Sequence, residues 1–287
     1  MKLLSVGPLL PLILLCFACT TSVAGQSSGA LAHYDLAAAP AARVELPAEL
    51  YEISGIASQA DSRLLAHSDE VAVIWQLDWP SGRTVKRFGI GGSSGPIRAD
   101  FEDIQLVGSR IYLVTSTGQI VEAREGADGQ TSPALRTSSG LKAGCEVEGM
   151  SWDAPSGSML LLCKSVKSRR WKDHVVVLAV SPETGRFEPK PRLTVPESEL
   201  ERATGVKRFS GTALVRHPRT GTYLMLAGPQ RAYAEIDSTG KVLGGGKLSP
   251  QRHRQPEGIA IAPDLTLLIS DEGAGKKGTI TGYAYRR

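Results

Sequence analysis

The hydrophobic and polar positions along the chain predict many short strands. Beyond about residue 40, short apolar runs such as Ile111-Tyr112-Leu113-Val114 and Tyr223-Leu224-Met225-Leu226 alternate with segments rich in Gly, Pro, Ser and Asp. No stretch sustains the 3.6-residue period of a long amphipathic helix. Short apolar runs bounded by turn residues are typical of β-strands. The 31 Gly and 17 Pro agree with many turns, and we expect an all-β fold.

The apolar runs belong to a five-fold repeat. Each repeat opens with a head of an acidic or small residue and then Gly or Asp, and a second and a third strand follow. The spacings between aligned heads are 48, 46, 62 and 47 residues, counted from Gly55, Asp103, Gly149, Gly211 and Gly258. One such meander cannot bury both of its faces, whereas a closed ring of meanders can. The repeat therefore predicts a β-propeller.

The arithmetic of the repeat predicts five blades. The long interval exceeds the others by about 15 residues, which is too few for a sixth blade, and Pro196 to Gly205 reads as a short helix in a loop. A fourth strand is expected before new heads, as at Lys86 to Ile90 and Arg192 to Val195. The last blade ends after three strands, so Arg43 to Leu46 should complete it and remove an exposed edge. We expect a five-bladed propeller of four-stranded antiparallel blades over residues 41–287.

The first 25 residues read as an export signal. Lys2 precedes an apolar core, Leu9 to Phe17, which is too short to span a bilayer. Ser22-Val23-Ala24 suits cleavage by signal peptidase I. Alternatively, Cys19 resembles the lipidated cysteine of a bacterial lipoprotein, although Cys16 stands where that motif usually has Leu. Both alternatives place the domain in the periplasm or on the outer membrane of a Gram-negative bacterium, with residues 26–40 as a flexible tether.

Charge and hydropathy limit the classes of partner that the chain is expected to bind. The net charge of +4 is close to neutral for 287 residues and does not indicate nucleic-acid binding. No second apolar span follows the signal, so membrane association is expected only through a lipid on Cys19. We expect a monomer whose partner is a small molecule or an envelope component.

Two cysteines remain after the signal. Cys145 and Cys163 flank a turn, Asp153 to Ser158, and so fall on two antiparallel strands of one hairpin. An oxidising periplasm would allow them to form a disulfide. The alternative is a pair of buried free thiols.

The heads of the repeat bring carboxylates together. In a propeller the innermost strands line the central channel, so equivalent head residues converge there. The position before each aligned Gly or Asp is Ser54, Glu102, Glu148, Ser210 or Glu257. Like charges this close cannot all stay ionised without compensation, and a divalent cation with oxygen ligands, most simply calcium, would supply it. The alternative is that Glu148 or Glu257 bonds backbone amides or Arg208.

A second acidic group is expected near the mouth of the channel. His67-Ser68-Asp69-Glu70 and Ser270-Asp271-Glu272-Gly273 occupy equivalent places after the second strands of blades one and five. These blades are neighbours in the closed ring. His67, Asp69, Asp271 and Glu272, together with Glu52 of the first head, could form a rim for substrate or a second ligand shell. Equally, Asp-Glu-Gly is ordinary turn sequence.

The ordered motifs resemble a known family. Over residues 43–287, Glu-Ile-Ser-Gly, Asp-Phe-Glu-Asp, Cys-Glu-Val-Glu-Gly with Leu-Leu-Cys-Lys, Phe-Ser-Gly, Gln-Pro-Glu-Gly and Ser-Asp-Glu-Gly resemble the SdiA-regulated (YjiK-like) domain. The resemblance implies a five-bladed propeller, distantly similar to NHL-repeat propellers, with bound calcium and no established activity. Glu102, Glu148 and Glu257 sit in the matching motifs. Asp103 departs from the Gly of the other heads and adds a carboxylate, and Phe209 stands where Pro is expected.

Two classes of function follow. The first is a calcium-binding propeller that acts as a binding or scaffold module in the envelope. The second is a metal-dependent hydrolase of the lactonase, phosphoesterase or phytase kind. In the hydrolase, Glu102, Glu148 and Glu257 would hold the ion while His67, Asp69 or Asp271 acts as general base.

Overall fold

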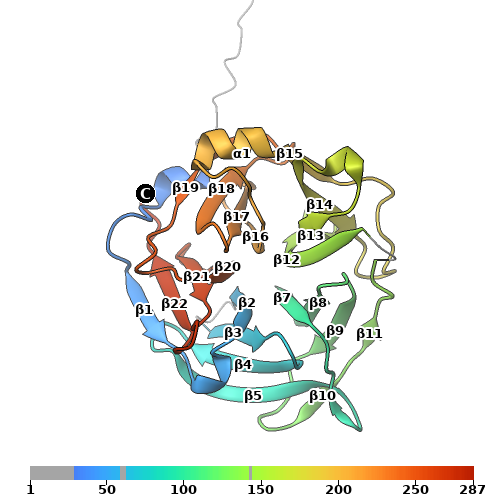
Figure 1. The fold of residues 1–287 in the computed structure, drawn as a ribbon. Helices are drawn as coiled ribbons and strands as arrows, with labels where there is room; N and C mark the ends of the chain where they lie inside the picture. Colours follow the sequence, from blue (N-terminus) through green and yellow to red (C-terminus); the bar gives the residue numbers. More distant parts are fainter. Residues whose placement is uncertain (1–28, 59–62, 142–143) are drawn as a thin grey trace, which may run out of the picture.

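The computed structural model describes residues 29–58, 63–141 and 144–287. Five antiparallel sheets stand in a ring around a central axis (Figure 1). This arrangement confirms the predicted five-bladed β-propeller. The predicted signal peptide (1–25), the lipidation candidate Cys19 and the first tether residues (26–28) lie outside the described residues.

Each blade is a meander whose innermost strand comes first in sequence, as the repeat predicted. The strands of blades one to three, from the axis outward, are β2 (Ile53–Ser58), β3 (Arg63–Ser68), β4 (Val73–Asp78) and β5 (Arg83–Gly92); β7 (Phe101–Val107), β8 (Arg110–Thr115), β9 (Ile120–Arg124) and β11 (Arg136–Thr137); and β12 (Cys145–Asp153), β13 (Ser158–Val166), β14 (His174–Val180) and β15 (Leu193–Pro196). Blade four contains β16 (Ala213–Arg216), β17 (Tyr223–Ala227), β18 (Ala232–Ile236) and β19 (Val242–Lys247). Blade one carries two short additions at its outer strand, β6 (Gly95–Pro96) and the parallel β10 (Thr131–Pro133).

Blade five closes the ring with both ends of the domain. Its strands β20 (Pro256–Ile261), β21 (Leu267–Asp271) and β22 (Thr279–Tyr283) are completed by β1 (Ala42–Glu45), which pairs antiparallel with β22 (Figure 1). Val44 lies opposite Ile280 in this pairing. The closure predicted from the phase of the repeat is therefore confirmed.

The hydrophobic core lies between adjacent blades. Leu160 and Leu162 of blade three, for example, pack with Leu214 and Met225 of blade four, and all four side chains are buried. Each blade thus buries one face against each neighbour, which is why no single meander is stable alone. The innermost strands are consequently held in fixed positions around the channel.

Short helices connect or flank the blades. The α-helix α1 (Glu197–Thr204) lies between β15 and β16, at the predicted place, and ends at Gly205 in the left-handed conformation. Three 3-10 turns, η1 (Ala30–His33), η2 (Ala48–Leu50) and η3 (Arg169–Trp171), complete the helical elements of the described residues. None of the helices in this described part is long and apolar enough to cross a bilayer.

Residues 29–40 differ from the flexible tether that the sequence suggested. Ala30, Tyr34 and Leu36 are buried. The buried carboxylate of Glu235 accepts the backbone N–H groups of Ala30 and Leu31, and Arg252 donates to the carbonyl oxygens of residues 36–38. The Ala-rich composition indicated a linker because it lacks a strand pattern. Its few apolar side chains nevertheless fill the gap at blades four and five.

The cysteines of blade three form a disulfide. Cys145 on β12 and Cys163 on β13 have Cα atoms 5.6 Å apart and are bonded in the structure. The bond joins the two strands of one hairpin beside Glu146 and Lys164.

Candidate functional site

Three glutamates lie at equivalent β-bulges in the innermost strands of their blades. On β7, Phe101 pairs with Thr115 and Asp103 with Val114, so Glu102 has no partner on β8. Glu148 on β12 and Glu257 on β20 are skipped in the same way. A β-bulge leaves one residue unpaired and re-aims its side chain. The bulges therefore turn the glutamates of three blades away from the inter-blade cores.

The three glutamates line a single cavity of about 300 Å³ where the innermost strands begin. Three other predicted residues, Ser54, Asp69 and Glu272, line it too. So do five residues that the sequence did not single out: Asp100, Glu146, Lys164, Thr212 and Gln255. Carboxylates dominate this lining, which we call the acidic cavity.

Lys164 is the one cation among the described residues that line the acidic cavity. Its Nζ donates a hydrogen bond to Oε1 of Glu148 at 2.7 Å and lies 3.9 Å from Oε1 of Glu146. Burial disfavours the charged ammonium, but this hydrogen bond and the glutamate charges outweigh burial and raise the pKa of Lys164. One tethered ammonium thus compensates part of the negative charge.

The remaining negative charge contributes to the raised pKa values of the glutamates. Burial, followed by the charges of Glu148 and Asp100, raises the pKa of Glu102 to about 9. Burial, followed by Glu272 and Glu148, raises the pKa of Glu257 to about 8, and burial with Asp69 and Glu52 raises that of Glu272 to about 7. Each shift means that the cavity, as it stands, disfavours a further ionised carboxylate.

The donor chemistry of the acidic cavity suits a hard cation. Its ligating atoms are carboxylate, hydroxyl and amide oxygens, the groups that calcium takes. In the described part of the chain, however, no three Asp, Glu, His or Cys side chains are arranged so that together they could hold a metal ion. A bound cation would therefore require the long glutamate side chains to converge. It would also require the hydrogen bond between Lys164 and Glu148 to break.

His67 does not belong to the acidic cavity. It is fully buried, its Nε2 accepts the backbone N–H of Gly55 at 3.2 Å, and Nδ1 lies 2.9 Å from the carbonyl oxygen of Ser68. Burial lowers its pKa to about 4. The prediction of His67 as a rim residue or general base is wrong, because its side chain is buried and hydrogen-bonded to the backbone of its own blade.

Asp103 also points away from the cavity. Its Oδ2 accepts the backbone N–H of Met150 in blade three at 2.6 Å, and its Oδ1 accepts that of Ile104. Gly55 in blade one leaves the room for this carboxylate, since a β-carbon there would lie 2.6 Å from Oδ1. Asp103 is thus a buried link between blades, which explains why this head departs from Gly.

Asp271 is buried inside blade five. Its Oδ2 lies 2.8 Å from Nδ1 of His253, whose Nε2 lies 2.7 Å from the hydroxyl of Tyr283. The predicted role at the rim is wrong for Asp271, because its carboxylate is turned toward His253 inside the blade. Glu272, which follows the end of β21, lines the acidic cavity instead. Glu52 is half-buried outside the cavity lining and acts on it through its charge.

Blade four contributes Thr212 in place of Ser210. Both the backbone N–H and the hydroxyl of Ser210 bond the side chain of Gln230. Thr212 lines the cavity, and its Oγ1 donates to the carbonyl oxygen of Pro256 in blade five. The repeat motif of blade four, around Gly211, lies before β16 and not within it. The alignment on Gly211 therefore predicted Ser210 at the channel, where the structure has Thr212.

Lys164 and Glu146 could have been found from the hairpin. Cys145 and Cys163 were expected on paired strands, and Glu146 and Lys164 directly follow them in the chain, so the hairpin was a signal that the two side chains lie near each other. The sequence offers less for Asp100 and Gln255, which lie before their strands in the connecting segments.

Solved structures with the same fold include two propellers of comparable size. Glutaminyl cyclase from Myxococcus xanthus matches with a TM-score of 0.57 at 13% identity, covering 86% of this chain and 95% of that one. PQQ-bound aldose sugar dehydrogenase from Streptomyces coelicolor matches with a TM-score of 0.52 at 13% identity, covering 86% and 99%. At this identity the likeness shows the fold alone. The sequence matches no protein-family model and no curated protein.

Proposed function

We propose that this chain is an exported β-propeller of the SdiA-regulated type that binds a divalent cation, calcium, in the acidic cavity and acts as a binding or scaffold module. One observation carries the proposal: Glu102, Glu148 and Glu257 come from three different blades, sit at equivalent bulges and line one cavity. A purely structural polar channel does not require three bulged carboxylates to line one cavity.

Calcium is proposed for the chemistry of the donors. Calcium takes six to eight oxygen ligands in adaptable geometry, which suits side chains arriving from separate blades. Glu102, Glu148 and Glu257 would hold the ion, and hydroxyls such as Ser54 and Thr212 line the same cavity. The ion would neutralise their repulsion and tie three blades together. Its contribution would therefore be to the stability of the ring and to the recognition of an anionic ligand group.

The alternative, a metal-dependent hydrolase, is left with one candidate base. Asp69 lines the acidic cavity, whereas His67 and Asp271 are turned into the blades. Burial and the charge of Glu52 raise the pKa of Asp69, which is the direction that suits a general base. The binding module remains the proposal because two of the three bases predicted for the hydrolase are turned away from the acidic cavity.

Thermal unfolding tests the cation. The mature domain is compared in chelator, in excess calcium and in excess magnesium. A ligand at 100 times its dissociation constant stabilises by about 2.7 kcal/mol, which corresponds to about 5 to 10 °C for a domain of this size. Calcium should raise the midpoint by this amount in the wild type and in the exposed control Glu183→Gln, and not in Glu148→Gln. An unchanged wild-type midpoint overturns the proposal.

An activity screen tests the alternative. Lactones, phosphoesters and carboxyesters are offered to the calcium-loaded wild type, to Glu148→Gln and to Asp69→Asn. Hydrolysis that disappears in both variants, while calcium still stabilises Asp69→Asn, would favour the hydrolase. Hydrolysis that survives in Glu148→Gln would separate it from the proposed ion.

A further inference from the structure

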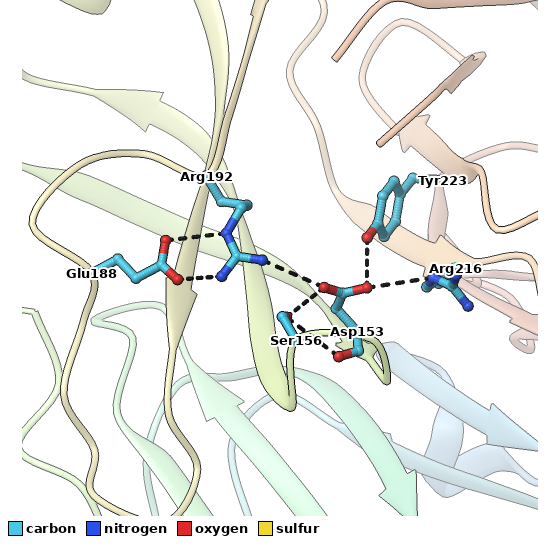
Figure 2. A network of polar contacts seen from close by, with 6 residues as sticks. All are labelled: Asp153, Ser156, Glu188, Arg192, Arg216 and Tyr223. Carbon is cyan, nitrogen blue, oxygen red and sulfur yellow. Dashed lines mark hydrogen bonds and ion pairs between the residues drawn. The ribbon is translucent and has the colours of Figure 1, made fainter. Parts of the chain in front are cut away.

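A second polar cavity lies between blades three and four, at the far ends of the strands that begin at the acidic cavity. It has a volume of about 350 Å³. Asp153, Arg192, Arg216 and Tyr223 are among its lining residues, and Figure 2 shows them converging. Asp153 follows Glu148 by five residues along β12, or about 16 Å of extended strand. The two cavities therefore lie toward opposite faces of the ring.

The acceptor atoms of Asp153 are already taken. Oδ1 accepts the Tyr223 hydroxyl at 2.9 Å and lies 3.4 Å from Nε of Arg216. Oδ2 lies 3.4 Å from Nη1 of Arg192 and accepts the Ser156 hydroxyl (Figure 2). A carboxylate has about four lone-pair positions. Three of them accept hydrogen bonds and the Arg216 guanidinium lies against the fourth, so this carboxylate, itself only 6% exposed, is covered by its neighbours.

The donors are not exhausted in the same way. Each guanidinium carries five N–H groups. Glu188 engages Arg192 from the solvent side with two contacts and fixes its orientation (Figure 2). Among the described residues, the guanidinium of Arg216 lies beside Asp153 and the Tyr223 hydroxyl, and its buried Nε, 3.4 Å from Oδ1 of Asp153, forms no hydrogen bond. Buried donors without partners are rare and call for one.

The position of Arg216 connects this cavity with the channel. Its Nη2 lies so close to Gly221 that a β-carbon there would be 2.9 Å away, so the glycine, with φ of +74°, keeps room for the guanidinium. Arg216 also lines a cavity of about 170 Å³ at the end of the innermost strands, beside the apolar side chains of Ile104, Met150 and Ile259. A group bound by Arg216 would thus have apolar surface next to it.

We propose that the cavity between blades three and four binds an oxyanion, the carboxylate or phosphate group of a small molecule, through Arg216 and Arg192. Guanidinium groups bind such anions in bidentate fashion. With Asp153 saturated, a ligand must supply acceptors instead of donors. Asp153 holds both guanidinium groups, and the end of the channel beside Ile104, Met150 and Ile259 receives the remainder of the ligand. The site uses none of the carboxylates of the acidic cavity and is independent of calcium.

NMR titration of the folded domain tests this site. Sodium phosphate and sodium acetate are added separately at constant ionic strength, with sodium chloride as the reference, and the side-chain N–H signals of Arg192 and Arg216 are followed. Three variants are compared with the wild type: Arg216→Gln, Arg216→Lys and Arg219→Gln. Arg219 is exposed on the same hairpin but does not line the cavity, so Arg219→Gln changes the local charge equally.

The site is supported by saturable chemical-shift changes with phosphate, acetate or both. The affinity obtained from them should be at least tenfold weaker in Arg216→Gln and within twofold of the wild-type affinity in Arg219→Gln. The anion that saturates at lower concentration identifies the ligand group as phosphate or carboxylate. Partial binding by Arg216→Lys supports a contribution from charge besides the bidentate geometry. Shifts that match those in chloride, or equal weakening in Arg216→Gln and Arg219→Gln, overturn the proposal. Unchanged backbone signals in each variant verify that it is folded.

Discussion

The ammonium group of Lys164 lies 2.7 Å from Oε1 of Glu148, inside the cavity where glutamates from three blades meet. A cation tethered to the chain thus stands beside a carboxylate that would hold a free one. The glutamates around this pair keep raised pKa values nevertheless, so one ammonium does not balance the cavity. A calcium ion that binds Glu148 would have to displace this ammonium group.

Lys164→Met should strengthen calcium binding. If calcium binds in the acidic cavity, removing the tethered competitor frees Glu148 and raises the affinity by about tenfold, or 1.4 kcal/mol. Without calcium the same variant should be less stable than the wild type, because Glu148 loses its partner. Isothermal titration calorimetry measures the first effect and chemical denaturation the second. Lys167→Met, at an exposed position on the same hairpin, serves as the control, and equal affinity in both variants would contradict the competition.

The calcium-free domain should lose stability as the pH rises. The pKa values of Glu272, Glu257 and Glu102 are raised from 4.5 to about 7, 8 and 9. The folded protein therefore holds protons that the unfolded chain releases. Their contribution to stability is complete below about pH 4.5 and is lost as the pH passes through the raised values.

Denaturant midpoints at about pH 6 and about pH 9, in chelator and in calcium, measure this dependence. The decrease should be large in chelator and small in calcium, because the ion stabilises the ionised carboxylates. A stability that stays constant or increases toward pH 9 in chelator would show that these carboxyls do not titrate as described.

Asp103→Ala should weaken the contact between blades two and three. The substitution leaves the backbone N–H groups of Met150 and Ile104 without their acceptor. Each buried, unsatisfied group costs about 1–3 kcal/mol, so the free energy of unfolding should fall by about 3 kcal/mol. Asp103→Asn should lose less, since one acceptor oxygen remains. Asp173→Ala, at an exposed position, should change little, and a comparably small loss in Asp103→Ala would refute the link.

Glu235→Ala should release the segment around Ala30. The carboxylate accepts two backbone N–H groups of this segment and the Thr222 hydroxyl, and it is almost fully buried. Its loss should lower the free energy of unfolding by about 2 kcal/mol or more and speed proteolysis near Tyr34. Limited proteolysis followed by mass spectrometry reports the site of cleavage. Cleavage no faster than in the exposed control Glu201→Ala would show that the segment is held by its apolar side chains alone.

The fold was largely predictable because a propeller is a repeat. Equivalent heads such as Gly55 and Gly258 recur at nearly constant spacing, and the phase of that spacing predicted that the strand near Val44 closes blade five. The packed segment around Tyr34 was not predictable in the same way. It has no repeat partner, and its burial depends on a gap between blades that appears only when the ring is assembled.

The repeat in the sequence was enough to predict the ring and the three glutamates, because the first strands of all repeats surround one axis. Which other polar side chains join Glu102, Glu148 and Glu257 depends on how the blades pack in the folded protein. Asp103 and Asp271 are acidic residues of the same motifs, yet the pleat turns them into the blades, while bulges turn the glutamates out. Lys164 enters from a second strand. A one-residue change of register reverses the face of a side chain, and that register is set by packing between blades.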